Sequence, residues 1–398
     1  DRLEVSWGFS TIDGGIEWTP WVLDKGYSSQ LLAGQETVLL RARDEDGDVG
    51  YAARRVFVAA DQSSVCTVTT ARDEDDGALD CSGGPDGQLS LDEALRLAPV
   101  LKFQVVGFNI PGPAALTGSP LQITEPIRLA GSPNLTLQRE LVIESQGKVR
   151  ISGLKISGPA GKITINNGSK LDLSDSEFSD AEPIRATGAV SVRRTAFRNC
   201  QSQCIVLSGG DGSVQVSQSS FIGGPASSVG IELDQCPVLV TLEPAADLVG
   251  NVFAGFTTAV FVNAGCQRPT SIVHQTFHGN TVAIMYQGGM QHVLRNNVFS
   301  SHTEPVLGCG LFGGFASRKD NVVWDYTYAD CLATDQGFVE TDPKFASPDA
   351  GDFRLRWESP LIDTAPLIVV DGGVVDINGA APDAYLGNGP DYGGRETY

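Results

Sequence analysis

Between about residue 150 and residue 300 the chain repeats a short pattern of apolar and polar positions. Each repeat has an aliphatic residue, a short polar residue three positions later, and a phenylalanine two positions after that. The phenylalanines follow one another at intervals of 19, 24, 32, 24 and 22 residues: Phe178, Phe197, Phe221, Phe253, Phe277 and Phe299. A period of this length predicts a solenoid in which each repeat forms one coil.

The residues between these phenylalanines favour strands over helices. They are β-branched triplets broken by Gly, Asn and Ser, whereas helix-pair repeats need longer stretches with apolar spacing of three and four. We therefore expect an all-β, right-handed parallel β-helix with three strands per coil and about nine to eleven coils. The phenylalanines should stack along the core at the ~4.8 Å strand spacing. The polar column should lie at a bend, with its side chains bonding one another and the backbone: Ser176, Thr195, Ser219, Asn251, Gln275 and Asn297.

The first sixty residues have a different pattern of apolar and polar positions. Alternating stretches at 3–7, 37–43 and 54–58 are separated by Asp/Gly-rich turns, a pattern that predicts the hairpins of a small antiparallel β-sandwich over residues 1–61. The segments Ser10–Gly15 and Trp18–Trp21 resemble the Ig-like or fibronectin-like modules of bacterial surface proteins. That resemblance implies that one or two strands precede the part seen here, so the module is expected to be truncated at its N-terminus or to adjoin another domain.

The sequence pattern of residues 62–112 predicts a cap for the solenoid. Ser90 with Glu93 three residues later forms a capping box, which predicts a short helix near 90–97 that covers the open end. The runs Thr67–Thr70 and Phe108–Gly112 resemble the N-terminal caps of bacterial surface β-helix proteins, with Asp92 where that family has arginine.

The predicted coils and the C-terminal segment also resemble known β-helix proteins. Segments 274–280 and 294–300 are similar to the coils of the pectin-lyase-like superfamily of right-handed parallel β-helices. Asp342–Phe345 and Ser359–Asp363 resemble the tail of bacterial surface β-helix proteins. We therefore expect a β-helix over residues 113–345 and a C-terminal cap or tail over 346–398.

Charge and cysteine content limit the cellular location and the classes of binding partner that we expect. The net charge is −20, with 28 basic and 48 acidic residues, which argues against nucleic acid as a partner. No apolar run approaches the ~18 residues of a membrane span. Eight dispersed cysteines favour disulfides of an exported, extracellular or cell-surface protein over zinc ligation, with free buried thiols as the alternative. They fall into near-neighbour pairs: Cys66/Cys81, Cys200/Cys204, Cys236/Cys266 and Cys309/Cys331.

The resemblance implies two kinds of active site. Polysaccharide lyases of this architecture use a Lys, Arg or His base near a carboxylate neutralised by Ca²⁺, Asn or Arg, and hydrolases use a pair of Asp residues. The columns three and four residues before each phenylalanine show neither paired Asp nor Lys beside Arg at equal offset. Within these columns the candidate catalytic residues are Arg194, His274 and Arg295.

The four histidines, His274, His278, His292 and His302, fall within 29 residues. Their different offsets from the phenylalanines favour surface or ladder histidines, with glycan contact, catalysis and metal binding as alternatives. Arg193 with Arg194, His274 and Arg295 forms either a basic stripe facing an acidic glycan or ordinary solvated strand faces. The candidate carbohydrate-binding residues are Arg193, His292, Trp324, Tyr326 and Tyr328, the aromatic ones alternatively packing the final coil against the tail.

A calcium site has weak support in the N-terminal module. Asp44, Asp46 and Asp48 alternate around Gly47, but the bidentate Glu of a calcium loop is absent, so a hairpin turn is the favoured interpretation. We expect no cofactor, with Ca²⁺ as the alternative.

Together these features predict a secreted or cell-surface structural or adhesive β-helix whose partner is an extracellular glycan or another cell-surface component. The alternative is a polysaccharide lyase or glycoside hydrolase of pectin-lyase-like fold, because one scaffold hosts both kinds of function.

Overall fold

The computed structural model describes most of the chain from residue 65 to residue 362 and parts of the segments on either side. The described ranges are 4–10, 16–18, 38–43, 49–54, 65–73, 78–83, 86–101, 105–362, 369–370 and 373–374. Within 105–362 the structure does not describe 133, 183, 211, 225–227, 237–243, 289–291, 309–314 and 328–338. The chain divides into two compact units, Asp1–Cys66 with Lys102–Val105, and Thr67–Leu101 with Val106–Tyr398. Among the described residues no helix is both long and apolar enough to cross a membrane.

The first unit contains one antiparallel sheet. Its strands are β1 (Glu4–Ser10), β2 (Ile16–Trp18), β3 (Val38–Arg43) and β4 (Val49–Arg54), in the order β2-β1-β3-β4. The second sheet of a sandwich is not among the residues described in this unit. The Ig-like or fibronectin-like module therefore has no structural support and stays a prediction. Asp44, Asp46 and Asp48 lie outside the described residues.

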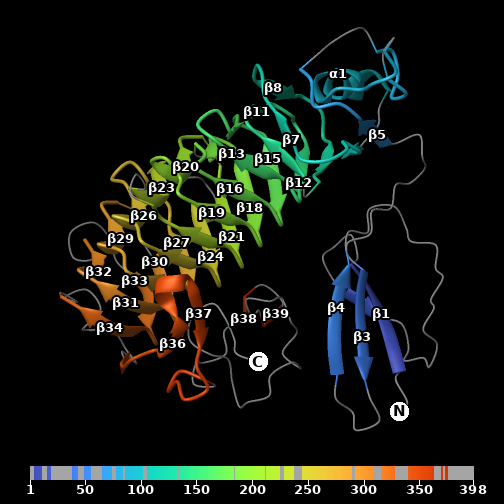
Figure 1. Cartoon of the computed structure of the whole chain (residues 1–398). Helices are drawn as coiled ribbons and strands as arrows, with labels where there is room; N and C mark the ends of the chain where they lie inside the picture. Colours follow the sequence, from blue (N-terminus) through green and yellow to red (C-terminus); the bar gives the residue numbers. More distant parts are fainter. Residues whose placement is uncertain are drawn as a thin grey trace. The chain divides into compact units, whose positions relative to one another are not determined.

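The second unit is a parallel β-helix built from three parallel sheets, stacked coil on coil from the cyan end at α1 to the orange end at β34 in Figure 1. In each coil the chain passes through sheet 1, sheet 2 and sheet 3 in turn. As described, sheets 1 and 2 have 11 strands each and sheet 3 has 9, which corresponds to about nine complete turns. The predicted β-helix with three strands per coil is thus confirmed.

The strand bounds follow the predicted repeat. Sheet 1 contains β5 (Val65–Val68), β6 (Val105–Phe108), β9 (Arg128–Ala130), β12 (Lys148–Ser152), β15 (Lys170–Ser174), β18 (Ala189–Arg193), β21 (Val214–Ser217), β24 (Ala246–Val249), β27 (Thr270–Val273), β30 (His292–Arg295) and β33 (Phe315–Lys319). Sheet 2 contains β7 (Ala114–Leu116), β10 (Leu135–Leu137), β13 (Lys155–Ser157), β16 (Glu177–Ser179), β19 (Ala196–Arg198), β22 (Ser220–Ile222), β25 (Val252–Ala254), β28 (Thr276–His278), β31 (Val298–His302), β34 (Val322–Tyr326) and β35 (Val339–Glu340). Sheet 3 contains β8 (Leu121–Ile123), β11 (Glu140–Ile143), β14 (Lys162–Ile165), β17 (Ile184–Ala186), β20 (Gln203–Ser208), β23 (Val229–Gln235), β26 (Thr258–Val262), β29 (Val282–Tyr286) and β32 (Glu304–Leu307).

The phenylalanine column forms the core beneath sheet 2. From Phe178 to Phe299 each ring stacks on the next, with centroid separations of 4.8, 4.6, 4.6, 5.3 and 5.1 Å. These separations match the strand spacing, because in-register parallel strands place equivalent side chains directly above one another. In the next coil Val323 aligns with Phe299, so the column continues with a smaller residue.

Two columns of left-handed backbone lie on either side of the phenylalanine column in sheet 2. Before the strand the column comprises Asp175, Arg194, Gln218, Gly250, His274, Asn296 and Asp320, with φ between 46° and 63°. The second column has φ between 51° and 76° and comprises Asp180, Asn199, Gly255 and Gly279, which follow a strand, and Ser301 and Asp325, which lie near the ends of β31 and β34. Asp, Asn and Gly tolerate this conformation best, which explains their frequency in both columns. The first column is the one from which the sequence selected catalytic candidates, and its shared property is a backbone bend.

The predicted polar ladder lies at the first of these bends. Asn297 Oδ1 accepts from the Gln275 amide at 2.9 Å, and its Nδ2 donates to the Ile272 carbonyl at 3.0 Å. The ladder extends one coil beyond the prediction, because Asn321 Oδ1 accepts from the Asn297 amide at 3.1 Å. Each side chain thus satisfies a buried backbone group that no strand can reach.

Replacing Asn297 with alanine is expected to lower the free energy of unfolding by about 2 kcal/mol, because it leaves the buried Gln275 amide and Ile272 carbonyl without partners. Asn166→Ala is the control. The Asn166 side chain donates to Glu144 at the surface, and its loss should cost about 0.5 kcal/mol or less. Urea denaturation of the two variants measures the difference, and equal losses would contradict the assigned role of the ladder.

The helix α1 (Leu91–Leu101) caps the second unit, as predicted. The Glu93 amide donates to Ser90 Oγ and the Ser90 amide donates to Glu93 Oε2, both at 3.1 Å, which is the predicted capping box. Asp92 in the first turn accepts two hydrogen bonds from Arg139, at 2.8 and 3.1 Å, so the cap is joined to the coils by an ion pair.

Residues 345–361 pack on the outer face of sheet 2. A hairpin of β36 (Phe345–Ser347) and β37 (Asp352–Leu355) surrounds the short helix η2 (Pro348–Ala350). The hairpin and Leu361 share an apolar cluster with outward side chains of β25, β31 and β34: Val252, Ala254, Val298 and Val322. A further two-stranded antiparallel pair is β38 (Val369–Val370) with β39 (Gly373–Val374).

Six cysteines of the described chain are in disulfides. Cys200 is bonded to Cys204 and Cys236 to Cys266, as predicted, and Cys66 and Cys81 are also disulfide-bonded. Cys309 and Cys331 lie outside the described residues. Disulfides persist in oxidising compartments, so this content indicates a secreted protein.

Candidate functional site

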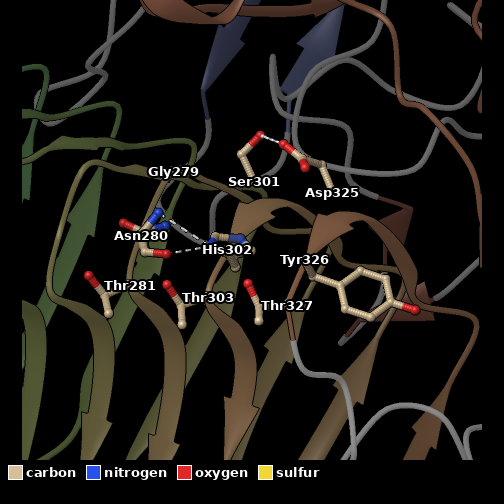
Figure 2. A pocket seen from close by; sticks show the side chains of 9 residues that line it. All are labelled: Gly279, Asn280, Thr281, Ser301, His302, Thr303, Asp325, Tyr326 and Thr327. Atoms are coloured by element: carbon tan, nitrogen blue, oxygen red, sulfur yellow. Dashed lines mark hydrogen bonds between the residues drawn. The ribbon is translucent and has the colours of Figure 1, made fainter.

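A groove with a volume of about 320 Å³ lies at the second bend, where sheet 2 turns into sheet 3. Three successive coils contribute three residues each: 279–281 after β28, 301–303 at the end of β31, and 325–327 at the end of β34. Figure 2 shows the corresponding side chains of the three coils side by side. The groove therefore has the same repeat as the solenoid.

The backbone gives the three positions of each triplet distinct roles. The first residue of each triplet, Gly279, Ser301 or Asp325, has φ of 60°, 58° or 52° and turns the chain. In the first two triplets the next residue, Asn280 or His302, is buried, and the third, Thr281 or Thr303, is exposed. In the last triplet Tyr326 is half-buried and Thr327 is exposed. A hydroxyl is thus presented at the same place in each coil.

These threonines belong to a longer column, which we call the hydroxyl ladder. Each member immediately precedes a strand of sheet 3 or occupies the equivalent place, as the registers of β20, β23, β26, β29 and β32 show. Its members are Ser202, Ser228, Thr257, Thr281, Thr303 and Thr327. The last three point their hydroxyls in the same direction (Figure 2). At the strand spacing of ~4.8 Å, they form a regular row of donors and acceptors.

His302 forms the floor of the groove. Its Nε2 lies 3.2 Å from the Phe277 carbonyl, and its Nδ1 lies 3.2 Å from the Asn280 amide. A neutral ring with its proton on Nε2 donates to the carbonyl and accepts from the amide. Burial lowers the pKa of His302 to about 4, so the ring is neutral at physiological pH and supports the bend.

Asp325 and Tyr326 form one end of the groove. Ser301 Oγ donates to Asp325 Oδ2 at 2.9 Å, which fixes the carboxylate at the surface. Partial burial raises the pKa of Tyr326, and the neighbouring Glu340 carboxylate raises it further, so the phenol keeps its proton. The groove thus offers hydroxyls, one carboxylate and one aromatic ring. Hydroxyls with an aromatic ring suit a hydroxylated ligand such as a sugar.

The structure places Tyr326 in the groove and Trp324 beside it. Tyr326 aligns with His302, and Trp324 aligns with Ser300 on the outer face of sheet 2. Trp324 is exposed, which leaves its ring available for contact. Tyr328 lies outside the described residues.

The catalytic candidates lie at or next to the first bend, away from the groove. Arg194 donates through Nε and Nη2 to both carboxylate oxygens of Asp175, at 2.7 and 2.9 Å. His274 is almost fully enclosed, and burial lowers its pKa to about 4. Arg194 is therefore held by a carboxylate and His274 is neutral, so neither has a free charge to offer a ligand.

Arg193 and Arg295 occupy the same column on the outer face of sheet 1, but β21, β24 and β27 lie between their strands. Lys319 in β33 lies in register with Arg295. The sequence-based conclusion that no Lys accompanies an Arg at equal offset was therefore wrong. It counted positions from the phenylalanines, and the coil that carries Lys319 has Val323 in their place.

His292 and His278 are in separate environments. His292 Nδ1 lies 2.9 Å from Thr270 Oγ1, the ring packs 4.2 Å from that of Tyr286, and burial lowers its pKa to about 4. His278 packs 5.4 Å from Phe353 of the C-terminal hairpin, and burial lowers its pKa below the usual value. The histidines are thus distributed around the coil. Within the described chain, no group of three or more His, Cys, Asp or Glu residues could hold a metal ion.

The hydroxyl ladder was not among the predicted features. Its signal is a Ser or Thr at the fourth position after the phenylalanine, present at Thr257, Thr281 and Thr303. A hydrophobicity pattern does not contain this signal, since the column is polar and exposed.

The β-helix is similar in chain path to one solved protein, described as pectate lyase Pel9A. The TM-score is 0.44 at 12% sequence identity, and the match covers 84% of this chain and 96% of that one. No protein-family model matches the sequence, and no curated protein matches it. The chain's own strand order defines a parallel β-helix of three sheets.

Proposed function

We propose that the protein is a secreted, structural or adhesive β-helix that binds an extracellular polysaccharide in the groove of the second bend. The observation that carries the proposal is the alignment of Thr281, Thr303 and Thr327 in three successive coils, with the Tyr326 ring at the end of the row. A saccharide chain running along this row would meet an equivalent hydroxyl at each coil. The disulfides support an extracellular location for that contact.

The polar character of the groove supports binding through many weak contacts. Each threonine hydroxyl both donates and accepts, as sugar hydroxyls do. Asp325 adds a carboxylate that accepts from a sugar hydroxyl, and the Tyr326 ring provides an apolar surface for a pyranose face. A row of equivalent contacts gains affinity with the length of the bound chain, because each further sugar is held near its site by the previous one.

Affinity electrophoresis with a panel of soluble neutral polysaccharides tests this proposal. We expect retardation of the native protein by at least one polymer, and about tenfold weaker affinity in Tyr326→Ala, which removes a stacking contact. Thr303→Val keeps the side-chain shape and should also weaken binding, because it removes one hydroxyl from the middle of the row. Thr136→Val, which replaces a half-buried threonine on β10 of sheet 2, is the matched control.

Two results would contradict the proposal. Wild-type affinity in both Tyr326→Ala and Thr303→Val would remove the groove as the binding site. Release of new reducing ends or unsaturated sugar products by the native protein would favour the lyase or hydrolase alternative over a structural or adhesive role.

A further inference from the structure

Two cations lie side by side on the outer face of sheet 1 in the last coils. Arg295 in β30 is in register with Lys319 in β33. The Arg295 side chain projects outward, because Leu294, its neighbour in the strand, is fully buried and side chains alternate along a strand. Lys319 occupies the equivalent position in the next coil and is half-buried. The two Cα positions are therefore about one strand spacing apart, ~4.8 Å.

No carboxylate balances this pair within the described chain. Neither Arg295 nor Lys319 has an ion pair within 4.0 Å there, although Lys148–Asp172, Lys162–Glu140, Arg194–Asp175 and Arg198–Glu177 all lie on other coils. The residue aligned with Arg295 in the preceding coil is Val273, which carries no charge. Arg128 and Arg150 are also in register, but the next residue of their column is Asp172.

The Arg295 guanidinium is also left with an unmet hydrogen bond. Its Nε is buried and has no hydrogen-bond partner within the part of the chain that the structure describes. At Arg194 and Arg354 the same Nε and Nη2 edge binds both oxygens of a carboxylate. Because Nε of Arg295 is enclosed while the side chain as a whole is half-buried, its Nη end is the part that a ligand can reach.

Two like charges directly opposite on neighbouring strands repel each other, and an unpaired buried donor adds a desolvation cost. A single anionic group bound between the two side chains, at the Nη end of Arg295, would relieve the repulsion between the charges. A guanidinium binds carboxylate or sulfate oxygens through its planar fork, and an ammonium adds a point charge beside it.

We propose that Arg295 and Lys319 form a binding site for the carboxylate or sulfate group of an acidic polysaccharide. This inference rests on the proposed polysaccharide function and adds a charged ligand class to it. The two sites belong to the same coils: Arg295 precedes β31 and Lys319 precedes β34, and the ends of β31 and β34 form the groove.

The test compares polygalacturonate with its methyl ester, which has the same backbone without the charge. Titration calorimetry of the full chain is done in EDTA, so that no divalent cation bridges carboxylates. We expect tighter binding of polygalacturonate than of the ester. Arg295→Gln and Lys319→Gln should each weaken polygalacturonate binding about tenfold, and the double variant should lose the preference for the acid form. The salt dependence of the affinity should become weaker in the double variant.

Arg150→Gln and Lys170→Gln are the matched controls, since both replace outward, exposed cations of sheet 1 in the early coils. They should bind polygalacturonate as the native protein does. A thermal melt of every variant confirms folding, and Lys319→Gln gives a result even where Arg295→Gln is less stable.

Three outcomes would overturn the inference. The first is native affinity for polygalacturonate in the double variant, and the second is equal native affinity for acid and ester. The third is binding of inorganic sulfate as tight as that of the polymer, which would indicate a small-anion site. The groove proposal fails separately, when Tyr326→Ala and Thr303→Val leave binding of neutral polymers unchanged.

Discussion

Replacing Arg139 with alanine is expected to lower the free energy of unfolding by about 3 kcal/mol. The Arg139 side chain is 1% exposed and holds three segments together. Its Nη atoms donate to Asp92 of α1 at 2.8 and 3.1 Å, Nη1 lies 3.3 Å from Asp73, and Nε donates to the Ser119 carbonyl at 2.6 Å. Removal of one partner from a buried ion pair costs roughly 3–5 kcal/mol. The lower end applies because both carboxylates are partly exposed.

Arg354→Ala is the matched control, because Arg354 makes the same two-pronged contact with Asp352 but is 62% exposed. An exposed ion pair contributes about 0–1 kcal/mol, so this variant should unfold close to the native denaturant concentration. Urea denaturation followed by circular dichroism measures both. If Arg139→Ala is as mild as Arg354→Ala, the ion pair does not hold the cap on the coils.

Acidification from pH 7 to pH 5 is expected to destabilise the β-helix by about 5 kcal/mol. His274, His292 and His302 each have a pKa lowered by burial to about 4, against about 6.5 in an unfolded chain. Between these values the unfolded chain binds protons that the folded chain excludes, so stability falls as pH decreases through 6.5. Each unit of pH across this range costs about 1.4 kcal/mol per histidine, and the onset near 6.5 reduces the total.

The measurement is urea denaturation at half-unit steps of pH. His302→Gln should give a shallower pH dependence by about one proton, because glutamine can still donate to the Phe277 carbonyl and accept from the Asn280 amide without titrating. His278→Gln is the comparison. His278 is less buried, and Asp349 and Asp325 oppose the lowering of its pKa, so its loss should change the slope less. A flat stability profile between pH 7 and pH 5 would contradict the burial of the three rings.

The sequence predicted the features that repeat in hydrophobicity. The stack from Phe178 to Phe299 and the ladder through Asn297 both follow from spacing, because an in-register solenoid repeats equivalent side chains at equivalent places. The predicted repeat ended before Val323, because this coil has valine where the earlier coils have phenylalanine. For that reason the pairing of Arg295 with Lys319 and the last ladder member, Asn321, were not recognised.

The candidate site was harder to predict because its residue types have several physical roles. Asp175, His274 and Asn296 suggest chemistry in a one-dimensional column, but in the fold they share a positive φ that turns the backbone. Asp92 was noted in the sequence as a departure from a related pattern. Its partner, Arg139, is 47 residues away and could be found only from the folded structure.

The C-terminal hairpin has a consequence for the way the β-helix meets its surroundings. The solenoid is a three-sided prism, and over β25, β31 and β34 the hairpin occupies one of its sides through Phe345, Phe353 and Leu355. A ligand approaching these coils is therefore expected to bind at the groove on the edge between sheets 2 and 3, or on the face of sheet 1 that carries Arg295. Because residues 345–361 cover the outer face of sheet 2 in these coils, the faces of the repeated coils are not equivalent for binding a ligand.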